Sequence, residues 1–309
     1  MAATAMDRPF EIGVVAPIFQ TGPDRSIPSG NEILAQARRA EELGFDTIWA
    51  PDELLWQIEG EAPRGGWDGV SVAGAIAAVT SRANVGTWVL SALHRNPGII
   101  AKTAETLDAL SNGRFVFGLG AGHPDPGQAR AFGLPETDTF ARFEEALEII
   151  VPLLREGRAN FEGTFHAARD LVQAPRGPRA GAIPLMIGGN GPKGVRLAAR
   201  YADIYSSYLT SRDTEAALAE RLKAFDAACV EVGRDPSTIG RSMGAYVRPF
   251  EPAGARPANL SGSPEEIAEQ ILSFRRAGYT QVELMYQPGT MDVLEALAPV
   301  LDAVRKLLG

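Results

Sequence analysis

The stretch LMIGGNGPKGVRLAARYAD, at 185–203 of the 309-residue chain, joins an apolar run to a helical pattern. The turn between them consists of Gly188, Gly189, Asn190, Gly191 and Pro192. Proline suits the first position of a helix, and the free N–H groups of a helix start bind phosphate. Lys193 and Arg196 add positive charge nearby. The turn therefore favours an anion site, and a tight strand-to-helix connection is the structural alternative.

Two adjacent acids, Asp52 and Glu53, follow the apolar run at 46–51. Successive side chains of an extended segment point to opposite sides, so at most one of these carboxylates can face a shared site. A carboxylate there can hydrogen-bond a ligand or move a proton. A solvated loop acid or a helix cap is the structural alternative. Both acids are therefore candidate catalytic residues.

Glycines alternate in the segment GLGAGHPD, at positions 118, 120 and 122. One face of that strand therefore has room for a bulky group. The pattern is not a dinucleotide fingerprint, because the loop that starts at His123 follows it in place of a helix. His123 lies just beyond the cleared face and is a candidate acid–base residue. Trp88 ends another apolar run, where it fills the core or offers a flat surface to a ring.

These residues need elements that bring them together, and short apolar runs alternate with helical patterns from end to end. The expected strands span 11–19, 46–51, 84–92, 114–122, 183–189, 202–209, 239–250 and 281–287. Eight such units favour a closed (β/α)8 TIM barrel over an open doubly wound sheet. We expect one barrel domain over 1–309, with a hairpin and loop inserted at about 157–182, before the fifth strand. Chemistry then belongs at the C-terminal ends of the strands.

Bulk composition excludes several classes of protein. The net charge of −8 argues against binding to nucleic acid or to anionic membranes. One cysteine, Cys229, cannot build a disulfide framework or a thiolate metal site, and we expect it to be buried. The three histidines, at 94, 123 and 166, are too dispersed to predict a metal site. No signal peptide or membrane-spanning run is expected, so we expect a cytoplasmic protein.

Several longer stretches carry a family resemblance. They are AEELGFDTIWAPDELL, AAVTSRANVGTWVLSALHRNPGIIAKTAETLDALSNGRFVFGLGAG, FARFEEALEIIVPLLREG with FEGTFH behind it, and PLMIGGNGPKGVRLAARYAD. Together they cover most of 30–205, and the chain resembles the bacterial luciferase-like, flavin- or deazaflavin-dependent oxidoreductases. The resemblance implies a (β/α)8 barrel with an insertion before strand five and a cofactor ring standing in the barrel mouth.

The resemblance also assigns cofactor-binding residues. It implies a phosphate on the turn at Gly188, Gly189, Asn190, Gly191 and Pro192. A nonprolyl cis peptide bond, by position Trp88–Val89, would back the ring. Gly120, Ala121 and Gly122 would pass close to the ring or its side chain. Many family members have Asp-His after strand two, whereas this chain has Asp52-Glu53. Glu53 replaces that histidine, His123 supplies the acid–base group, or the chemistry differs, and the sequence leaves all three open.

The short insertion and the IGGNGP form resemble the branch that uses the deazaflavin coenzyme F420. We therefore expect an oxidoreductase that moves a hydride between F420 and a small organic substrate. An FMN-dependent monooxygenase that uses reduced flavin and O2 is the alternative, and a non-catalytic cofactor-binding protein is the second. The family implies a homodimer, and a flavin or F420 reductase as the supplier of reduced cofactor. The loop at 57–69 is either a lid, with Trp67 over the mouth, or a plain surface loop.

Overall fold

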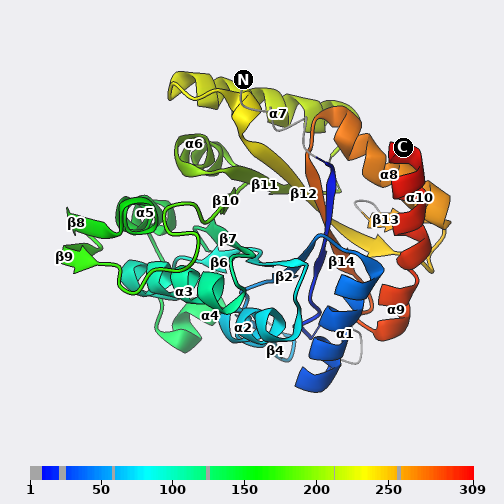
Figure 1. Cartoon of the computed structure of the whole chain (residues 1–309), viewed down its shortest axis with the longest axis horizontal. Coiled ribbons are helices and arrows are strands. Elements are labelled where there is room, and N and C mark those ends of the chain that lie inside the picture. Colours follow the sequence, from blue (N-terminus) through cyan, green and yellow to red (C-terminus); the bar gives the residue numbers. More distant parts are fainter. Residues whose placement is uncertain (1–8, 21–25, 58–59, 123–125, 212, 256–258) are drawn as a thin grey trace.

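The computed structural model describes residues 9–20, 26–57, 60–122, 126–211, 213–255 and 259–309. Within them, eight parallel strands close into a barrel (Figure 1), because the last strand pairs with both the first and the one before it. In order around the barrel the strands are β1 (Glu11–Val15), β2 (Thr47–Ala50), β5 (Asn84–Thr87), β7 (Phe115–Gly120), β10 (Leu185–Gly188), β11 (Ile204–Tyr208), β12 (Gly240–Arg248) and β14 (Gln281–Tyr286). The predicted (β/α)8 barrel is confirmed.

Helices surround these strands (Figure 1). They are α1 (Gly30–Leu43), α2 (Gly69–Val79), α3 (Pro97–Leu110), α5 (Thr139–Glu156), α6 (Pro192–Tyr201), α7 (Glu215–Glu231), α8 (Pro264–Ala277), α9 (Met291–Glu295) and α10 (Ala298–Leu308). Local signals set their starts: Ser263 and Glu266 form the capping box of α8, and Asn96 caps α3. The C-terminal segment forms two helices, α9 and α10, because Pro299 lacks the N–H that a helix interior needs and fits the first turn of α10.

Two expected strands are shorter or divided. The run at 11–19 is a strand only as far as Val15, since Pro17 cannot donate to a neighbouring strand. The run at 84–92 is split into β5 and β6 (Leu90–Ser91). Four short elements lack a counterpart in the predicted pattern: β3 (Leu55–Trp56), β4 (Arg64–Gly65), α4 (Pro126–Phe132) and β13 (Asn259–Ser261).

Trp49 fills the centre of the barrel. Glycines make room for its indole: a Cβ on Gly13 would come within 2.3 Å of Trp49 Nε1, and one on Gly86 within 2.2 Å of Trp49 Cζ3. Glu283 lies in the same layer, where its Oε1 accepts hydrogen bonds from Gln281 Nε2 at 2.6 Å and Ser242 Oγ at 3.0 Å. Complete burial raises the pKa of Glu283 to about 8, outweighing those hydrogen bonds.

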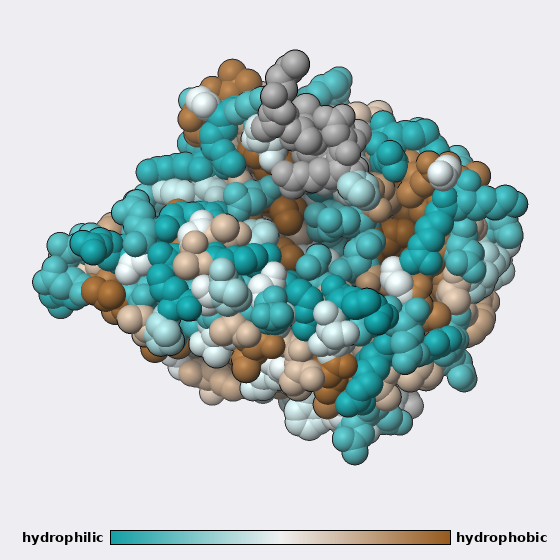
Figure 2. All heavy atoms as spheres, in the orientation of Figure 1, coloured by the Kyte–Doolittle hydropathy of each residue, from teal (hydrophilic) through white to brown (hydrophobic). Residues whose placement is uncertain are grey.

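A hairpin occupies the place of the predicted insertion. Strands β8 (Arg158–Glu162) and β9 (Ala167–Val172) pair antiparallel and project from the barrel. Figure 2 shows hydrophilic side chains over most of this projecting end. The loop that follows returns to the barrel through ion pairs from Arg176 to Glu105, at 3.1 Å, and from Arg179 to Asp108, at 2.6 Å. No helix in the described part of the chain is long and apolar enough to cross a membrane.

Candidate active site

A pocket of about 290 Å³ opens at the C-terminal ends of the barrel strands. Its described lining comes from strand ends and from β3: Val15, Ala16, Pro17, Phe19, Pro51, Glu53, Trp56, Trp88, Tyr246, Met285, Tyr286 and Gln287. This is the end at which TIM barrels carry their catalytic residues. Aromatic and aliphatic side chains dominate, with Glu53 as the carboxylate of the described lining.

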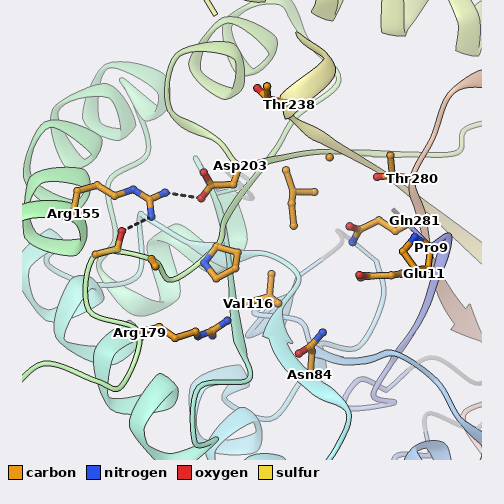
Figure 3. A pocket seen from close by; sticks show the side chains of 15 residues that line it. Pro9, Glu11, Asn84, Val116, Arg155, Arg179, Asp203, Thr238, Thr280 and Gln281 are labelled. Carbon is orange, nitrogen blue, oxygen red and sulfur yellow. Dashed lines mark hydrogen bonds and ion pairs between the residues drawn. The ribbon is translucent and has the colours of Figure 1, made fainter. Parts of the chain in front are cut away.

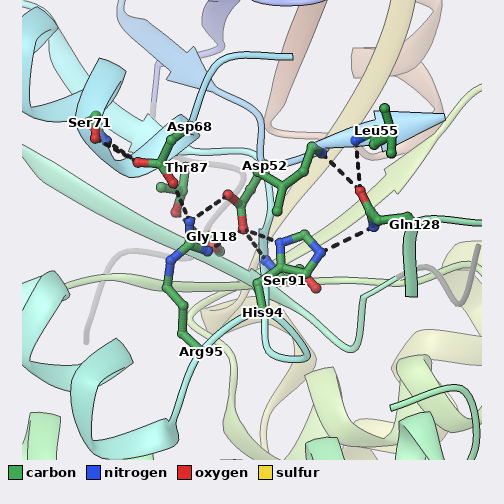
Figure 4. A network of polar contacts seen from close by, with 11 residues as sticks. Asp52, Leu55, Asp68, Ser71, Thr87, Ser91, His94, Arg95, Gly118 and Gln128 are labelled. Atoms are coloured by element: carbon green, nitrogen blue, oxygen red, sulfur yellow. Dashed lines mark hydrogen bonds and ion pairs between the residues drawn. The ribbon is translucent and has the colours of Figure 1, made fainter. Parts of the chain in front are cut away.

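The two adjacent acids have different surroundings, as strand alternation predicts. Glu53 lines the pocket, whereas Asp52 is buried behind it. Asp52 accepts hydrogen bonds from Arg95 Nη1 at 2.6 Å and from Ser91 N at 3.0 Å (Figure 4). Arg95 also pairs with Asp68, the N-cap of α2, at 2.5 Å. Asp52 therefore ties the end of β2 to β6 and to the start of α3, and so supports the segment that carries Glu53.

His94 joins this network from the other side (Figure 4). Its Nδ1 lies 3.2 Å from Asp52 Oδ2, and its Nε2 lies 3.3 Å from Gln128 Nε2. Gln128 Oε1 accepts from the backbone N–H groups of Leu54 and Leu55, at 3.0 and 2.9 Å. The Gln128 amide thus presents its NH2 group to the imidazole. His94 therefore bridges the Asp52 carboxylate, on its Nδ1 side, and the Gln128 amide, on its Nε2 side.

Burial and charge oppose each other at Asp52. Burial alone would raise the pKa of this carboxyl, but hydrogen bonds from His94 and Arg95, together with the charge of Arg95, hold its pKa below the usual range. At Arg95, burial lowers the guanidinium pKa, yet the contacts with Asp52 and Asp68 raise it overall. The pair stays ionised at neutral pH. Asp52 is therefore better suited to holding the strand ends in place than to moving a proton.

The peptide bond between Trp88 and Val89 is cis, as the resemblance predicts. The Trp88 indole lines the pocket and donates from Nε1 to Ser206 Oγ at 3.1 Å. Val89 lies against the glycine faces of the neighbouring strands. A Cβ on Gly120 would come within 2.8 Å of Val89 Cγ2, and one on Gly188 within 3.4 Å. Gly120 and Gly188 therefore leave room for the side chain of Val89.

Beyond β7, Ala121 is buried and Gly122 has a φ of +91°, a left-handed conformation that favours glycine. A Cβ on Gly122 would come within 2.4 Å of Ser91 Oγ. Ala121 and Gly122 are not among the described residues that line the pocket. Their predicted contact with a cofactor stays a prediction.

Helix α6 begins at Pro192, and no side chain of the described residues caps its N-terminus. Gly191 is the N-cap residue, and a Cβ there would meet no atom of the described chain within 4 Å. The N–H groups of the first turn therefore adjoin open space, as an anion site requires. A groove of about 380 Å³ next to this helix is lined in part by Lys193, Arg196 and Arg200. Positive charge thus lies close to the helix start.

The turn before α6 also has packing reasons for its composition. A Cβ on Gly189 would come within 3.1 Å of Gly194 Cα, so the strand and the helix approach closely. Asn190 holds the turn against β11, donating from Nδ2 to Tyr208 O at 3.3 Å and accepting from Tyr208 N at 3.4 Å. Packing therefore accounts for Gly188 and Gly189, while Gly191 leaves the helix start accessible.

A second and larger cavity, of about 600 Å³, lies at the N-terminal ends of the strands (Figure 3). The two arginines in its lining are already engaged. Arg155 pairs with Asp203 at 2.5 Å and donates to Ile183 O at 2.9 Å, while Arg179 pairs with Asp108. Side chains at this end of a TIM barrel serve stability. The C-terminal pocket is therefore the candidate site.

Among the three predicted catalytic residues, Glu53 lines the pocket, Asp52 supports it, and His123 lies outside the described residues. Of the aromatic lining, the prediction missed Phe19 and Trp56. In the loop at 57–69, Trp67 is 52% exposed and lies outside the described lining, whereas Trp56 of β3 lines the pocket. The presence of a tryptophan in this loop suggested a lid. The sequence could not show that Trp56 lines the pocket and Trp67 does not.

Comparison with known proteins places this geometry in a family. The model of the luciferase-like monooxygenase family matches residues 10–249. An F420-dependent glucose-6-phosphate dehydrogenase of Microbacterium testaceum is 33% identical over 242 residues, which cover 77% of this chain and 68% of that protein. An F420-dependent hydroxymycolic acid dehydrogenase of Mycobacterium tuberculosis is 30% identical over 261 residues, covering 81% of this chain and 66% of that one. The chain spans 51–56% of the length of four further glucose-6-phosphate dehydrogenase relatives.

Solved structures share the fold. An F420-dependent secondary alcohol dehydrogenase in complex with an F420–acetone adduct superimposes with a TM-score of 0.79 at 21% identity, covering 96% of this chain and 100% of that one. An identity this low shows the fold alone. The family model covers well over half of the sequence, and the chain therefore belongs to the luciferase-like monooxygenase family.

Proposed function

We propose that this protein is an F420-dependent oxidoreductase that transfers a hydride between the deazaflavin and a small organic substrate. One observation carries the proposal: the uncapped start of α6, the cis Trp88–Val89 bond and the pocket with Glu53 share one end of the barrel. The relatives named as F420-dependent dehydrogenases support the choice of cofactor.

The residues present fit a phosphorylated ring cofactor. The first-turn N–H groups of α6 after Gly191 would hold the phosphate, since no described side chain caps them. Val89 would back the ring, and Gly120 and Gly188 would flank it, because these three residues already form one packed surface. When bound, the cofactor supplies the hydride chemistry at C5 of its ring, and the protein supplies orientation and electrostatics.

Glu53 is the proposed proton carrier. It is the carboxylate of the described pocket lining, and its own backbone is fixed. Gln128 accepts from the N–H groups of the next two residues, and a Cβ on Gly66 would come within 2.6 Å of Glu53 O. The carboxylate can therefore take the proton of a substrate hydroxyl, or return it to a carbonyl oxygen, from a defined position. His123 is the alternative carrier.

The test is a pair of titrations on cofactor-stripped protein, one following the fluorescence of F420 and the other that of FMN. Micromolar binding of F420 with weaker or no binding of FMN is the expected result. Binding of FMN alone would replace the proposal with the flavin-dependent monooxygenase, to be followed by oxygen uptake with a reductase. Binding of neither would remove the phosphate role of the α6 start. Binding of F420 without turnover of any substrate would favour a non-catalytic cofactor-binding protein.

Three further features belong to the same proposal. The protein acts in the cytoplasm as a homodimer, and a flavin or F420 reductase supplies reduced cofactor. The family resemblance implies the homodimer and the reductase. Light scattering at micromolar concentration tests the dimer, and a mass of one chain would contradict it.

A further inference from the structure

We infer that the substrate is an uncharged alcohol, or the matching carbonyl compound, with an apolar ring or chain next to the reacting carbon, and that sugar phosphates are excluded. The inference rests on the proposed function, because it takes the C-terminal pocket as the place where substrate meets cofactor. It follows from the chemistry of the pocket lining.

The lining offers apolar surface on most sides. Phe19, Trp56, Trp88 and Tyr246 contribute rings, and Val15, Met285 and two prolines contribute aliphatic surface. Tyr286 adds little polarity, because its hydroxyl donates to Gln36 Oε1 outside the pocket, at 2.5 Å. Rings and aliphatic groups bind a ligand by removing its apolar surface from water and by stacking. The body of the substrate should therefore be apolar.

A phosphorylated substrate would lack a cationic partner among the described residues that line this pocket. None of the described lining residues is a lysine, an arginine or a histidine. Arg248, which donates to the lining residue Gln287, is also paired with Glu251 at 3.3 Å. A phosphate dianion held among aromatic rings beside the Glu53 carboxylate would lose its hydration shell. The described lining offers no charged hydrogen-bond donor in exchange. The relatives named as glucose-6-phosphate dehydrogenases act on such a dianion, so this chain should differ from them in substrate.

The aromatic wall, formed by Phe19, Trp56, Trp88 and Tyr246, is held in place by contacts within the fold. Phe19 and Trp56 meet edge to face, with ring centroids 4.9 Å apart. The β3–β4 hairpin that carries Trp56 is joined to the segment after β1, since Gln20 N donates to Gly65 O at 3.1 Å and Trp67 N donates to Ile18 O at 3.0 Å. Two segments far apart in sequence therefore hold the two rings together. Such a pre-formed wall lowers the entropic cost of binding a flat or branched apolar group.

The size of the pocket limits the substrate. A volume of about 290 Å³ lies at the low end of the range of roughly 300–1,000 Å³ for small-molecule sites. One ring or a short branched chain fits, and a longer body must extend into solvent. In the oxidising direction the carbinol carbon loses a hydride to oxidised F420, while the hydroxyl loses its proton to the Glu53 carboxylate. The C–H and O–H bonds break, the C=O π bond forms, and the carboxylate later releases the proton to water.

The test measures binding separately from turnover. Intrinsic tryptophan fluorescence reports on the pocket, because Trp56 and Trp88 line it. The probes are 1-phenylethanol, cyclohexanol, acetophenone and glucose 6-phosphate, each titrated into protein already shown to bind F420. We expect saturable binding of the first three and none of glucose 6-phosphate. Trp56→Ala should weaken the binding of 1-phenylethanol about tenfold, whereas Trp67→Ala, the matched change two residues after β4, should leave it unchanged.

The possible outcomes separate this inference from the proposed function. F420 binding with saturable glucose 6-phosphate binding, or with no binding of any uncharged probe, overturns the substrate class and leaves the cofactor assignment intact. Equal losses in Trp56→Ala and Trp67→Ala overturn the role of the aromatic wall. Absence of F420 binding is a failure of the proposed function itself. With F420 and a bound alcohol, formation of reduced F420 in step with the ketone is the expected turnover.

Discussion

The barrel has a cavity at each end, and the two differ in what lines them. The N-terminal cavity is about twice as large, and its charged residues are engaged in ion pairs and in hydrogen bonds to backbone carbonyls. The C-terminal pocket is smaller and aromatic, and it brings the carboxylate of Glu53 to the rim. Volume therefore does not mark the site in this molecule. The distinguishing feature is a polar group presented to an otherwise apolar space.

The two ends also differ in the partners of their carboxylates. At the C-terminal end, Arg95 and His94 both contact the buried Asp52 carboxylate, whereas Glu53 lies on the pocket side. At the N-terminal end, Asp203 pairs with Arg155 and accepts from Leu185 N at 2.8 Å, which fixes the start of β10. Both ends use carboxylates to hold strands, and at the C-terminal end a second acid, Glu53, directly follows the first in the sequence and lines the pocket.

The largest expected effect is on turnover. Glu53→Gln keeps the size of the side chain but removes the proton carrier, so kcat should fall about a thousandfold, within the range of about 10²–10⁴ for acid–base residues. Glu11→Gln, the matched change in the N-terminal cavity, should alter kcat by less than about threefold. Steady-state kinetics with F420 and an alcohol provides the measurement. Equal losses of kcat in the two variants would contradict the assignment of catalysis to the C-terminal pocket.

The next effect is on stability. Asp52→Asn leaves Arg95 partly buried without its main charge partner, so the free energy of unfolding should fall by about 3 kcal/mol. Asp203→Asn should cost about 1 kcal/mol or less, because the Asp203 side chain is 44% exposed. Urea denaturation of both variants at pH 7 tests this order. A larger loss in Asp203→Asn would show that the N-terminal pair carries more of the stability.

The Asp52 contribution has a defined pH dependence. The pKa of this carboxyl is lowered in the folded state, so its contribution is complete above the unfolded value of about 3.9 and is lost as the pH falls through the folded value. The difference in unfolding free energy between the wild type and Asp52→Asn should therefore shrink in acid. A difference that stays constant down to the folded pKa and below would contradict the ion pair.

Glu283, between the two cavities, should show the opposite sign. Its folded pKa is about 8, against an ordinary value of 4.5. Stability should fall as the pH rises from about 4.5 to 8, because only the unfolded carboxyl ionises in that window, with a slope of up to about 1.4 kcal/mol per pH unit. Glu283→Gln should remove this slope relative to the wild type. Parallel stability–pH curves for the two proteins would show that the buried carboxyl is ionised in the fold.

The barrel itself was predictable because its signals are local. Buried parallel strands are continuous apolar runs, and helix starts such as Ser263 and Asn96 carry capping residues. The cis peptide bond at Trp88–Val89 was expected only from the family resemblance, since no periodicity marks it. The β3–β4 hairpin was missed because two-residue strands are too short to show a period of two.

The site was only partly predictable, for a related reason. Alternation along the chain separates Asp52 from Glu53, and this was expected. The partners of Asp52 are about 40 residues distant, and nothing in the sequence pairs His94 with Gln128. The alternate glycines of β7 did indicate a bulky neighbour, but sequence could not show that Val89 is such a neighbour. Tertiary contacts decide which residues face the pocket.

The most direct test of the account is F420 binding to the wild type and to two variants of Gly191. In Gly191→Asp, a carboxylate would cap α6 and occupy its first N–H groups. It should stabilise the protein by about 1 kcal/mol while weakening F420 binding about tenfold or more. Gly191→Ala should leave affinity within about threefold, because a Cβ at this position meets open space. Unchanged F420 affinity in Gly191→Asp would contradict the claim that the C-terminal end binds the cofactor through the start of α6.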